Sequence, residues 1–392
     1  QQAFLLTFIT LGISSIISAV NFLVTVARLR TTGMTPMRMP IFVWSLVVTT
    51  TLVLMATSVV AAALTMVLFD RLLGTSFFRP GGGGDPLLYQ HLFWFYSHPA
   101  VYVMGVPAFG AILEVVPVFA RKPLFAYRLA VLSFIGIGLL SFMVWAHHMF
   151  VSGMAEFFHI PIMVTTELIS VPTGIVFLSA LGTIWLGRIR FTVPMLWVFG
   201  FLWNFVIGGI TGVYLADVPT DLALSDTYFV VAHFHYTIVG GMVTGLFAGT
   251  YYWFPKITGR LMSERLGRIH FWSFTLAFNA TFLPMFWLGL QGMRRRVADF
   301  PTELSDVNLW TSVASFVIAL STAVFLWNAI RSWVRGPLAS ANPWRAQTLE
   351  WQVASPPPVE NFEHPPVVTS GPYEYGTPTP APALSAGGAA GR

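Results

Sequence analysis

Histidines that could bind metals occur in strongly apolar stretches of this chain: His98, His147, His148, His233 and His235. Imidazole is a common ligand of copper and of heme iron. Ionisable side chains are costly at bilayer depth, where they usually mark a pathway or a cofactor. A single buried histidine is more often a hydrogen-bonded core residue. This set, spread over three predicted helices, instead favours metal ligation.

His233 and His235 are separated by one residue, Phe234. On a helix, two positions correspond to about 200° of rotation, so the two imidazoles point to nearly opposite sides. Two ligands of one metal would be three or four residues apart. The pair therefore suits two cofactors, one on each side of the helix, and flat macrocycles with axial iron ligands fit that geometry.

His98 and Tyr102 are four residues apart and share a helix face. His147 and His148 are neighbours, splayed by about 100° on a helix. Three imidazoles from two helices can form a trigonal copper site with an open position, which oxygen chemistry requires. Tyr102 beside His98 could supply a proton and an electron. The alternative is an amphipathic tyrosine that is hydrogen-bonded within the bundle.

The composition is that of an integral membrane protein: 55% of the 392 residues are hydrophobic and 9% are charged, against about 25% charged in soluble domains. The mean hydropathy is +0.71. The absence of cysteine excludes disulfides and thiolate metal sites. Residues 1–335 are predicted to form one transmembrane helical bundle. Residues 336–392, rich in Pro, Gly and Ala, are predicted to form an extramembrane tail whose last part is disordered. Apolar runs long enough to cross a bilayer occupy residues 3–27, 42–69, 90–118, 126–150, 160–186, 193–215, 228–254, 270–291 and 309–333.

Basic residues gather in alternate loops, as the positive-inside rule requires of a membrane protein. This pattern accounts for the net charge of +5 without a nucleic-acid partner. The opposite loops are richer in aspartate, such as Asp217, Asp221 and Asp226. The first helix then runs from outside to inside, and the chain begins with Gln1, so we expect it to be part of a longer protein. The basic loop residues are Arg28, Arg30, Arg38, Arg121, Lys122, Arg128, Arg188, Arg190, Lys256, Arg260, Arg265, Arg268, Arg331 and Arg335.

Three stretches of the sequence closely resemble subunit I of the heme-copper oxygen reductases, the aa3-type cytochrome c oxidases. They are HLFWFYSHPAVY from His91, VWAHHMF from Val144 and DTYFVVAHFHY from Asp226. The resemblance covers nearly the whole chain. It implies that His98, His147 and His148 bind CuB, that His233 is the proximal ligand of the high-spin heme a3, and that His235 is an axial ligand of the low-spin heme a. Tyr102 matches the tyrosine that is cross-linked to the first copper histidine.

The family has twelve transmembrane helices, and the resemblance implies that the nine predicted here are helices 4–12. The second axial ligand of heme a would then be missing from this chain. Gly292 begins a basic segment at the end of the eighth predicted helix, where the resemblance implies that Arg295 and Arg296 bind heme propionates. Guanidinium suits such carboxylates. A solvated charged loop is the alternative.

The sequence departs from the family at proton-transfer positions. Most mitochondrial-type relatives have a glutamate two residues after the first copper histidine, where this chain has Ala100. Tyr96 lies one turn before Ala100 and Ser97 follows it, as in a Tyr-Ser subgroup common among bacterial enzymes. We expect the Tyr96 hydroxyl to reach the space that the glutamate would occupy.

The second proton channel of the family uses a lysine shortly after a Pro-Thr-Gly sequence. Here Thr173 and Gly174 are followed by Val176 at that position. Glu167, expected to be a buried carboxylate, is a candidate substitute relay together with Thr173. Waters or a carboxylate from another subunit are equally good alternatives. The family's His-Asp magnesium pair is replaced by Ser225 and Asp226, so a magnesium site would be weakened.

The resemblance implies the catalytic subunit of a respiratory oxidase, which reduces O2 to water and translocates protons. Its partners would be a subunit II carrying the CuA centre, subunit III and cytochrome c, in the plasma membrane of a bacterium. A nitric oxide reductase or a quinol oxidase of the same superfamily are alternatives. Retention of Tyr102 argues against the first, whereas Val176 in place of lysine keeps it open. A polytopic transporter would explain the hydropathy but not the histidines.

Overall fold

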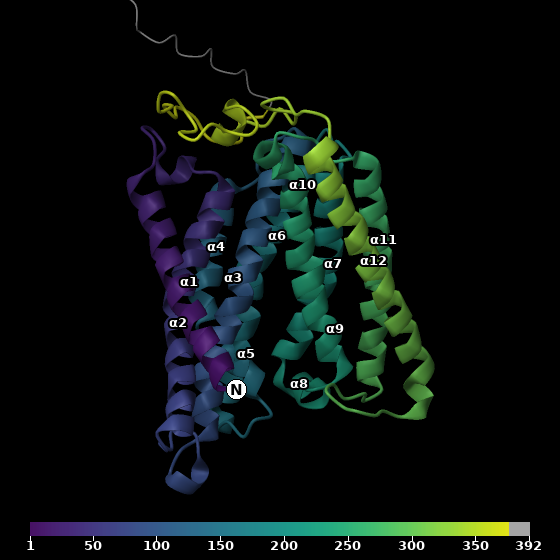
Figure 1. The fold of residues 1–392 in the computed structure, drawn as a ribbon. Helices are drawn as coiled ribbons and strands as arrows, with labels where there is room; N and C mark the ends of the chain where they lie inside the picture. Colours follow the sequence, from purple (N-terminus) through teal and green to yellow (C-terminus); the bar gives the residue numbers. More distant parts are fainter. Residues whose placement is uncertain (376–392) are drawn as a thin grey trace, which may run out of the picture.

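The computed structural model describes residues 1–375, and the secondary-structure elements in that range are all helices. Figure 1 shows the helices packed side by side in one bundle, with the polypeptide after the last helix lying across one end. Its α-helices are α1 (Gln2–Arg28), α2 (Ile41–Leu72), α3 (Pro86–Ala120), α4 (Tyr127–Ser141), α5 (His159–Leu168), α6 (Ser170–Ile184), α7 (Val193–Ala216), α8 (Val218–Leu224), α9 (Tyr228–Thr237), α10 (Thr244–Thr258), α11 (Glu264–Leu290) and α12 (Ser305–Arg335).

Eight helical segments within residues 1–375 are long and apolar enough to cross a membrane. The predicted count of nine is therefore not confirmed. The fourth predicted span, 126–150, contains α4, which has only 15 residues and is about 22 Å long at 1.5 Å per residue. The apolar run continues, but the backbone changes to a 3₁₀ turn over Trp145–Met149. Hydropathy does not register such a change of backbone.

A π-helical segment, Ile238–Val243, joins α9 to α10. Its two buried glycines allow close approach of α7. A Cβ on Gly240 would lie 2.7 Å from the Cβ of Asn204, and one on Gly241 would lie 2.8 Å from the Phe205 ring. Since π-segments widen a helix locally and often accompany functional sites, this one fixes how α9 leans on α7 directly after its two histidines.

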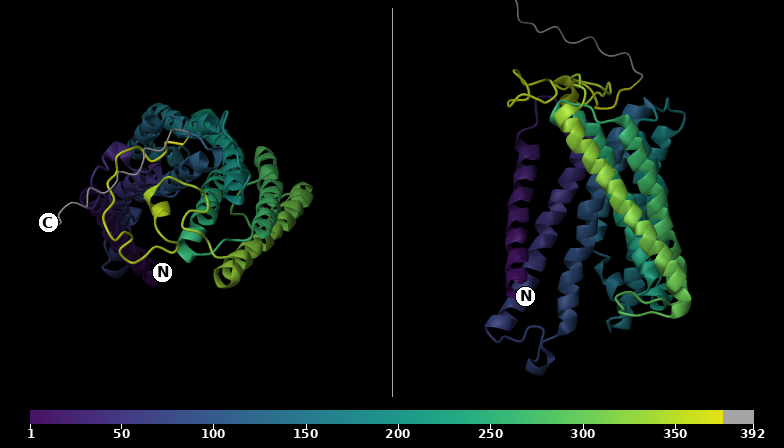
Figure 2. Two further views of the ribbon diagram at one scale, coloured as in Figure 1. Left: turned by 90° about the horizontal axis from the view of Figure 1, so that it is seen from above. Right: turned by 45° about the vertical axis from the view of Figure 1, so that its right-hand side comes forward.

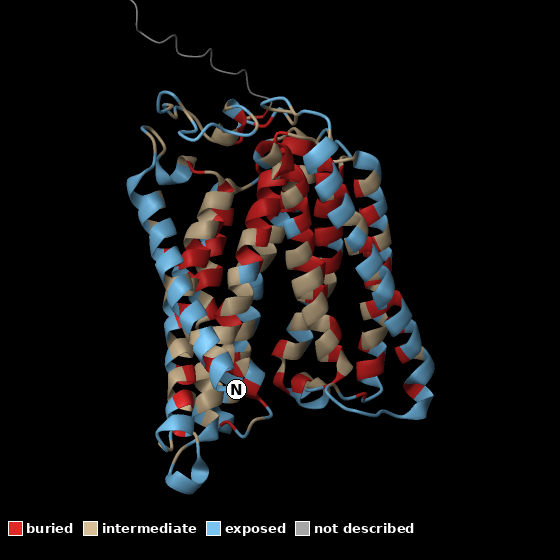
Figure 3. Ribbon diagram, in the orientation of Figure 1, coloured by how far each residue is buried: buried red, intermediate tan, exposed pale blue. Residues whose placement is uncertain are grey.

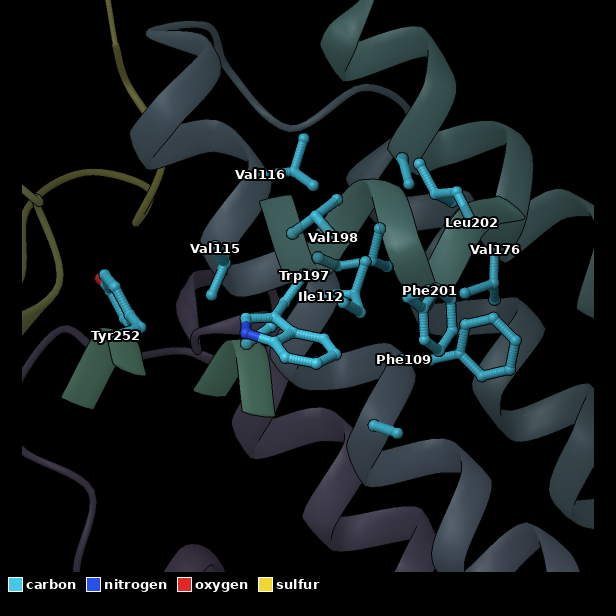
Figure 4. Close-up of a cluster of buried hydrophobic side chains, with 14 of the residues drawn as sticks. Phe109, Ile112, Val115, Val116, Val176, Trp197, Val198, Phe201, Leu202 and Tyr252 are labelled. Carbon is cyan, nitrogen blue, oxygen red and sulfur yellow. The ribbon is translucent and has the colours of Figure 1, made fainter. Parts of the chain in front are cut away.

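The apolar core lies toward the end of the bundle that the tail covers, where buried residues are concentrated in Figure 3. Side chains of α3 and α7 pack against each other there, among them Ile112, Trp197 and Phe201 (Figure 4). Val176 of α6 is fully buried in the same cluster, with 0% exposure. The position at which the resemblance implies a lysine is thus part of an apolar core in this chain.

The segment after α12 crosses the bundle end, as the view from above in Figure 2 shows. It is anchored by buried aromatic residues, Trp351, Tyr373 and Tyr375, which are only 1%, 6% and 6% exposed. Basic side chains of the bundle donate hydrogen bonds to its carbonyls: Arg121 to Trp344 O at 2.6 Å and Lys256 to Val353 O at 2.7 Å. The composition did not predict this docking. The predicted disorder falls on residues 376–392, outside the described residues.

Candidate functional site

Three imidazoles converge in the structure as their spacing predicted. His98 Nδ1 lies 3.3 Å from His148 Nε2, and His147 Nε2 lies 3.1 Å from the same atom. One ring nitrogen from each residue falls within 4.8 Å of the others. Three imidazole nitrogens this close, with no carboxylate among them, form the donor set that copper favours. The residues present therefore fit a copper ion.

The two adjacent histidines lie in the 3₁₀ turn Trp145–Met149, so the expectation that they lie on a helix was wrong. The turn nevertheless aims the Nε2 atoms of His147 and His148 at one point. The ring of Trp94 stacks on His148, with centroids 3.9 Å apart and 13° between the planes. This contact holds the orientation of an imidazole that is otherwise exposed in the chain.

Thr166, which the sequence analysis did not single out, fixes the tautomer of His147. Its hydroxyl lies 2.6 Å from the carbonyl of Ile162, to which it donates, and 3.1 Å from His147 Nδ1. Because the hydroxyl proton is used on the carbonyl, the oxygen accepts from Nδ1–H. The Nε2 lone pair of His147 therefore points toward the space between the three imidazoles. Metal-binding histidines are usually oriented by a contact of this kind.

Tyr102 lies one turn after His98 on α3, and the two ring centroids are 4.9 Å apart. His98 Nδ1 faces the other two histidines. Its Nε2 atom is buried and has no hydrogen-bond partner among the described residues. The unsatisfied nitrogen of His98 is thus on the side of its imidazole that faces away from the other two histidines.

His233 and His235 lie on α9 and face different helices, as predicted. His233 Nδ1 donates to Gly208 O on α7 at 3.0 Å. His235 stacks on Phe282 of α11, with centroids 4.0 Å apart, while its Nδ1 donates to Val231 O at 2.8 Å. In both residues the Nδ1 atom carries the proton, so the Nε2 lone pair is available to an axial metal.

The imidazole of His233 packs closely against a glycine of α7, Gly212. A Cβ on Gly212 would lie 2.8 Å from Cε1 of the His233 ring, closer than real contacts allow. The glycine therefore leaves the imidazole of His233 its position against α7. The protonated Nδ1 atoms, the free Nε2 atoms and this cradle together fit two axial ligands of heme iron on opposite sides of α9.

The basic segment after α11 meets the start of α9. Both Nε and a terminal nitrogen of Arg295 contact Oδ1 of Asp226, at 2.8 Å and 2.6 Å. The backbone N–H of Arg295 also donates to Asp226 O at 2.9 Å. Asp226, suggested as part of a weakened magnesium site, is thus paired with an arginine suggested as a propionate ligand. Arg296 is exposed, with a φ of 63°.

Asp221 lies beside this pair on α8, where it is only 7% exposed. Burial raises the pKa of its carboxyl to about 6 from an ordinary value of 3.8. The folded state thus favours the protonated acid. Its contribution to stability is fully present below pH 3.8 and is lost as the pH rises to about 6.

Asp221→Asn is therefore expected to stabilise the protein at pH 7.5 and not at pH 4. The gap between 3.8 and about 6 corresponds to about 3 kcal/mol as an upper value. Thermal unfolding midpoints measured at both pH values check this. Asp306→Asn, at an exposed position, is the control that changes the charge equally. An equal stabilisation at pH 4 and pH 7.5 would contradict the assignment.

The residues suggested for proton transfer are not brought together. Tyr96 and Ser97 are half-buried on α3, and the hydroxyl of Thr173 donates to Ile169 O within its own helix. Glu167 is exposed, so the expectation of a buried carboxylate was wrong. It follows Thr166, which faces His147, and a rotation of about 100° turns it outward.

A carboxylate that is buried within a long apolar helix lies at the tail-covered end of the bundle: Glu114 of α3, which is 1% exposed. Its Oε2 accepts from the hydroxyl of Tyr373 at 2.6 Å and from Phe42 N at 3.3 Å. Its Oε1 has no partner among the described residues. Glu114 was not predicted from the sequence. The signal that could have found it is a lone acidic residue within an otherwise apolar run, Ile112 to Ala120.

Comparison with known proteins gives concordant matches. Residues 1–326 match the family described as "Cytochrome C and Quinol oxidase polypeptide I". The chain is 50% identical over 379 residues to "Cytochrome c oxidase subunit 1" of Synechocystis sp., a match that covers 97% of this chain and 69% of that protein. It is 48% identical over 376 residues to the protein of the same name from Thermostichus vulcanus, covering 96% and 68%.

A solved structure supports the fold. The cryo-EM structure of a heme-copper terminal oxidase dimer superposes with a TM-score of 0.69 at 22% sequence identity, covering 77% of this chain and 58% of that chain. At this identity the match concerns the arrangement of the helices and not the chemistry. It shows that the all-helical bundle described above has the helix arrangement of that structure.

Proposed function

Because the chain belongs to the cytochrome c and quinol oxidase polypeptide I family and is the catalytic subunit of a terminal oxidase, we propose that it reduces O2 to water with electrons from cytochrome c. The reduction would take place at a heme a3–CuB centre and would be coupled to proton translocation. The observation that carries this proposal is the convergence of three imidazole nitrogens, each within 4.8 Å of the others.

The proposed metal centres follow from the donor atoms. His98 would bind CuB through Nδ1, and His147 and His148 would bind it through Nε2, since these atoms converge. His233 would be the axial ligand of heme a3 and His235 an axial ligand of heme a, each through Nε2. Copper and heme iron, when bound, supply the electrons and the binding site for oxygen.

The chain's own residues do the remaining work. Tyr102, beside His98, would hold a proton on its hydroxyl and release it next to the site where oxygen is reduced. Thr166 would keep His147 in the tautomer that binds metal. Arg295, held by Asp226, would present its remaining N–H groups to a heme carboxylate, and Arg296 would do so from the same segment. Magnesium has little to bind at Asp226, whose carboxylate already contacts Arg295.

As a member of this family the chain is a multi-pass membrane protein that works with other oxidase subunits. We propose that these are a subunit II with a CuA centre and a subunit III, in a bacterial plasma membrane. The relatives named above are bacterial. The electron donor would then be cytochrome c, since the same relatives are named cytochrome c oxidases.

The test uses purified complex that contains the full-length protein, because low-spin heme a needs a second axial ligand that the resemblance does not find in this chain. A reduced-minus-oxidised optical spectrum should show bands of both low-spin and high-spin heme, and reduced cytochrome c should support oxygen uptake. A spectrum without heme bands would contradict the proposal and favour a transporter. Consumption of nitric oxide without oxygen uptake would favour a nitric oxide reductase. Oxygen uptake with quinol but not with cytochrome c would identify a quinol oxidase.

Thr166→Val is expected to weaken copper binding about 10- to 100-fold, the usual effect of removing an outer-shell partner of a metal ligand. Valine preserves the shape but cannot accept the proton of His147 Nδ1. Copper content after dialysis against a graded chelator series measures the effect. Thr165→Val is the matched control, because Thr165 bonds to backbone carbonyls of Met143 and Pro161. Equal copper retention in the two variants would show that Thr166 does not support copper binding.

Tyr96 remains our proposal for the relay role lost at Ala100, and Ser97 would assist it. Tyr96→Phe is expected to slow oxygen turnover by about 100-fold, the lower end of the range for a group that passes a proton, with unchanged heme spectra. Stopped-flow oxygen reduction and proton release in vesicles measure this. An added Ala100→Glu change should partly restore the rate. Turnover and proton release at wild-type levels in Tyr96→Phe would contradict the proposal.

A further inference from the structure

A cationic cavity lies at the end of the bundle covered by the tail, at the C-terminal end of α3. Its volume is about 750 Å³. No aspartate or glutamate lines it, and the two ion pairs found among residues 1–375, Arg268–Glu264 and Arg295–Asp226, involve none of its cations. Its lining residues are Arg121, Lys122, Leu186, Gly187, Arg188, Arg190, Arg345 and Tyr375.

Three separate chain segments hold these cations in place. Arg121 ends α3 with a φ of 54°, and its guanidinium donates to the carbonyls of Trp344 and Arg345 in the tail, at 2.6 Å and 3.0 Å. Lys122 Nζ donates to Trp185 O at 2.7 Å. Arg121 and Lys122 therefore keep N–H groups that are not bonded to the protein, since guanidinium has five N–H groups and ammonium three.

Arg188 and Arg190 are fixed by their backbones rather than by their side chains. Their N–H groups donate to Ala120 O and Phe119 O, both at 2.8 Å. Ile189 between them packs against the apolar core. Alternation of this kind places Arg188 and Arg190 on the other side of the segment from Ile189, toward the cavity that they line.

The tail contributes Arg345, which has a φ of 56°, and Tyr375. The Tyr375 hydroxyl accepts from Gln347 N at 3.2 Å, so its own O–H remains a donor. The cavity therefore presents donors from four arginines, one lysine and one phenol, with no carboxylate acceptor in its lining. Burial, and then the like charge of Arg190, lowers the pKa of Arg121, as expected where cations crowd without an anion.

The mouth of the cavity lies at the level of a membrane surface. Trp185 and Leu186, which follow α6, are 71% and 85% exposed. Tryptophan at a helix end is typical of the membrane–water interface. Leu186 itself lines the cavity, so an apolar chain could lie beside a charged group bound there.

We propose that this cavity binds a phosphate-bearing anion, with Arg188, Arg190 and Arg345 as the charged donors and Tyr375 as the neutral one. Arginine clusters favour phosphate because guanidinium donates two parallel hydrogen bonds to it. The same chemistry is offered by the headgroup of an anionic phospholipid and by a free polyphosphate. A bound anion would join the end of α3, the α6–α7 loop and the tail, since all three contribute cations.

The test uses the purified holoenzyme in an uncharged detergent, with wild type and the double variant R188Q/R190Q. The free source is probed with inorganic pyrophosphate by titration calorimetry. The lipid source is probed by native mass spectrometry after incubation with phosphatidylglycerol or phosphatidylcholine. Loss of two charge-assisted contacts should weaken binding at least about 30-fold. The heme spectrum confirms that each variant is folded.

R331Q/R335Q is the matched control, because both positions are exposed on the last turns of α12 at the same end and do not line the cavity. It should bind as wild type does. Tyr375→Phe, which keeps all charges, should weaken binding about threefold to tenfold by removing one neutral donor, and it covers the case in which the double variant fails to fold.

Binding of pyrophosphate alone, weakened in R188Q/R190Q, would support a free polyphosphate as the ligand. Selective retention of phosphatidylglycerol over phosphatidylcholine, lost in the same variant, would support a lipid headgroup. Absence of both in wild type would overturn the proposal. An equal loss in R331Q/R335Q would also overturn it, since binding would then follow the overall charge of this face and not the cavity.

Discussion

The His98→Ala complex is expected to lose its copper and to reduce oxygen more than about 100-fold more slowly, because loss of a metal ligand exceeds the 10- to 100-fold cost of losing an outer-shell partner. His98 supplies one of only three converging nitrogens, and it is the one contributed by α3. Removing it leaves two ligands on adjacent residues of one 3₁₀ turn, which cannot enclose an ion.

Copper is measured by elemental analysis and the hemes by their optical spectra. The spectrum of low-spin heme should persist, because His235 lies on a different helix, α9. His91→Ala is the control on α3: its ring accepts a hydrogen bond from Trp145 Nε1 at 3.2 Å but is not one of the converging three. Full copper content in His98→Ala would disprove the proposed copper site.

Tyr102→Phe is expected to slow turnover at least about 100-fold, within the range for loss of a proton donor at the reacting centre, while copper and both hemes are retained. Phenylalanine keeps the ring against His98, whose centroid is 4.9 Å away, and removes only the hydroxyl. Unlike His98→Ala, this variant should therefore separate the chemistry from cofactor binding.

Oxygen uptake, copper content and heme spectra are measured on the same preparation. Tyr89→Phe is the control, since Tyr89 lies on the same helix but packs against Phe78 and Phe93. Wild-type turnover in Tyr102→Phe would show that its hydroxyl is only a structural group. A loss of copper in Tyr102→Phe would show that Tyr102 acts by positioning His98.

The clustering of the histidines could be predicted from the sequence because spacing along a helix determines which side chains share a face. His98 with Tyr102, and His233 against His235, lie as rotation about the α3 and α9 axes requires. The 3₁₀ turn at His147 could not be predicted, because a 3₁₀ and an α-helical backbone have the same hydropathy. The site formed regardless, since adjacent residues can converge on one point in either backbone.

Other features depend on tertiary contacts that no local pattern encodes. Glu167 looked buried because its segment is apolar, but amphipathicity of that segment is weak and its outward rotation depends on Thr166 facing His147. The docked tail was missed because a Pro-rich composition predicts disorder, whereas Trp351 and Tyr373 are buried against the bundle. The role of Thr166 was missed because a threonine within a helix has no distinctive sequence signature.

The hydroxyl of Tyr373 joins the tail to two helices of the bundle end: it accepts from Ile41 N of α2 at 2.7 Å and donates to Glu114 of α3 at 2.6 Å. These contacts span 332 and 259 residues of sequence. Chains emerge from the ribosome N-terminal end first, so α2 and α3 enter the membrane long before Tyr373 has been synthesised. During that interval the carboxylate of Glu114 and the first N–H of α2 lack this partner. Closure of this end of the bundle is therefore a late event in biogenesis. A ribosome stalled before the codon for Tyr373 would hold a bundle that lacks these two hydrogen bonds.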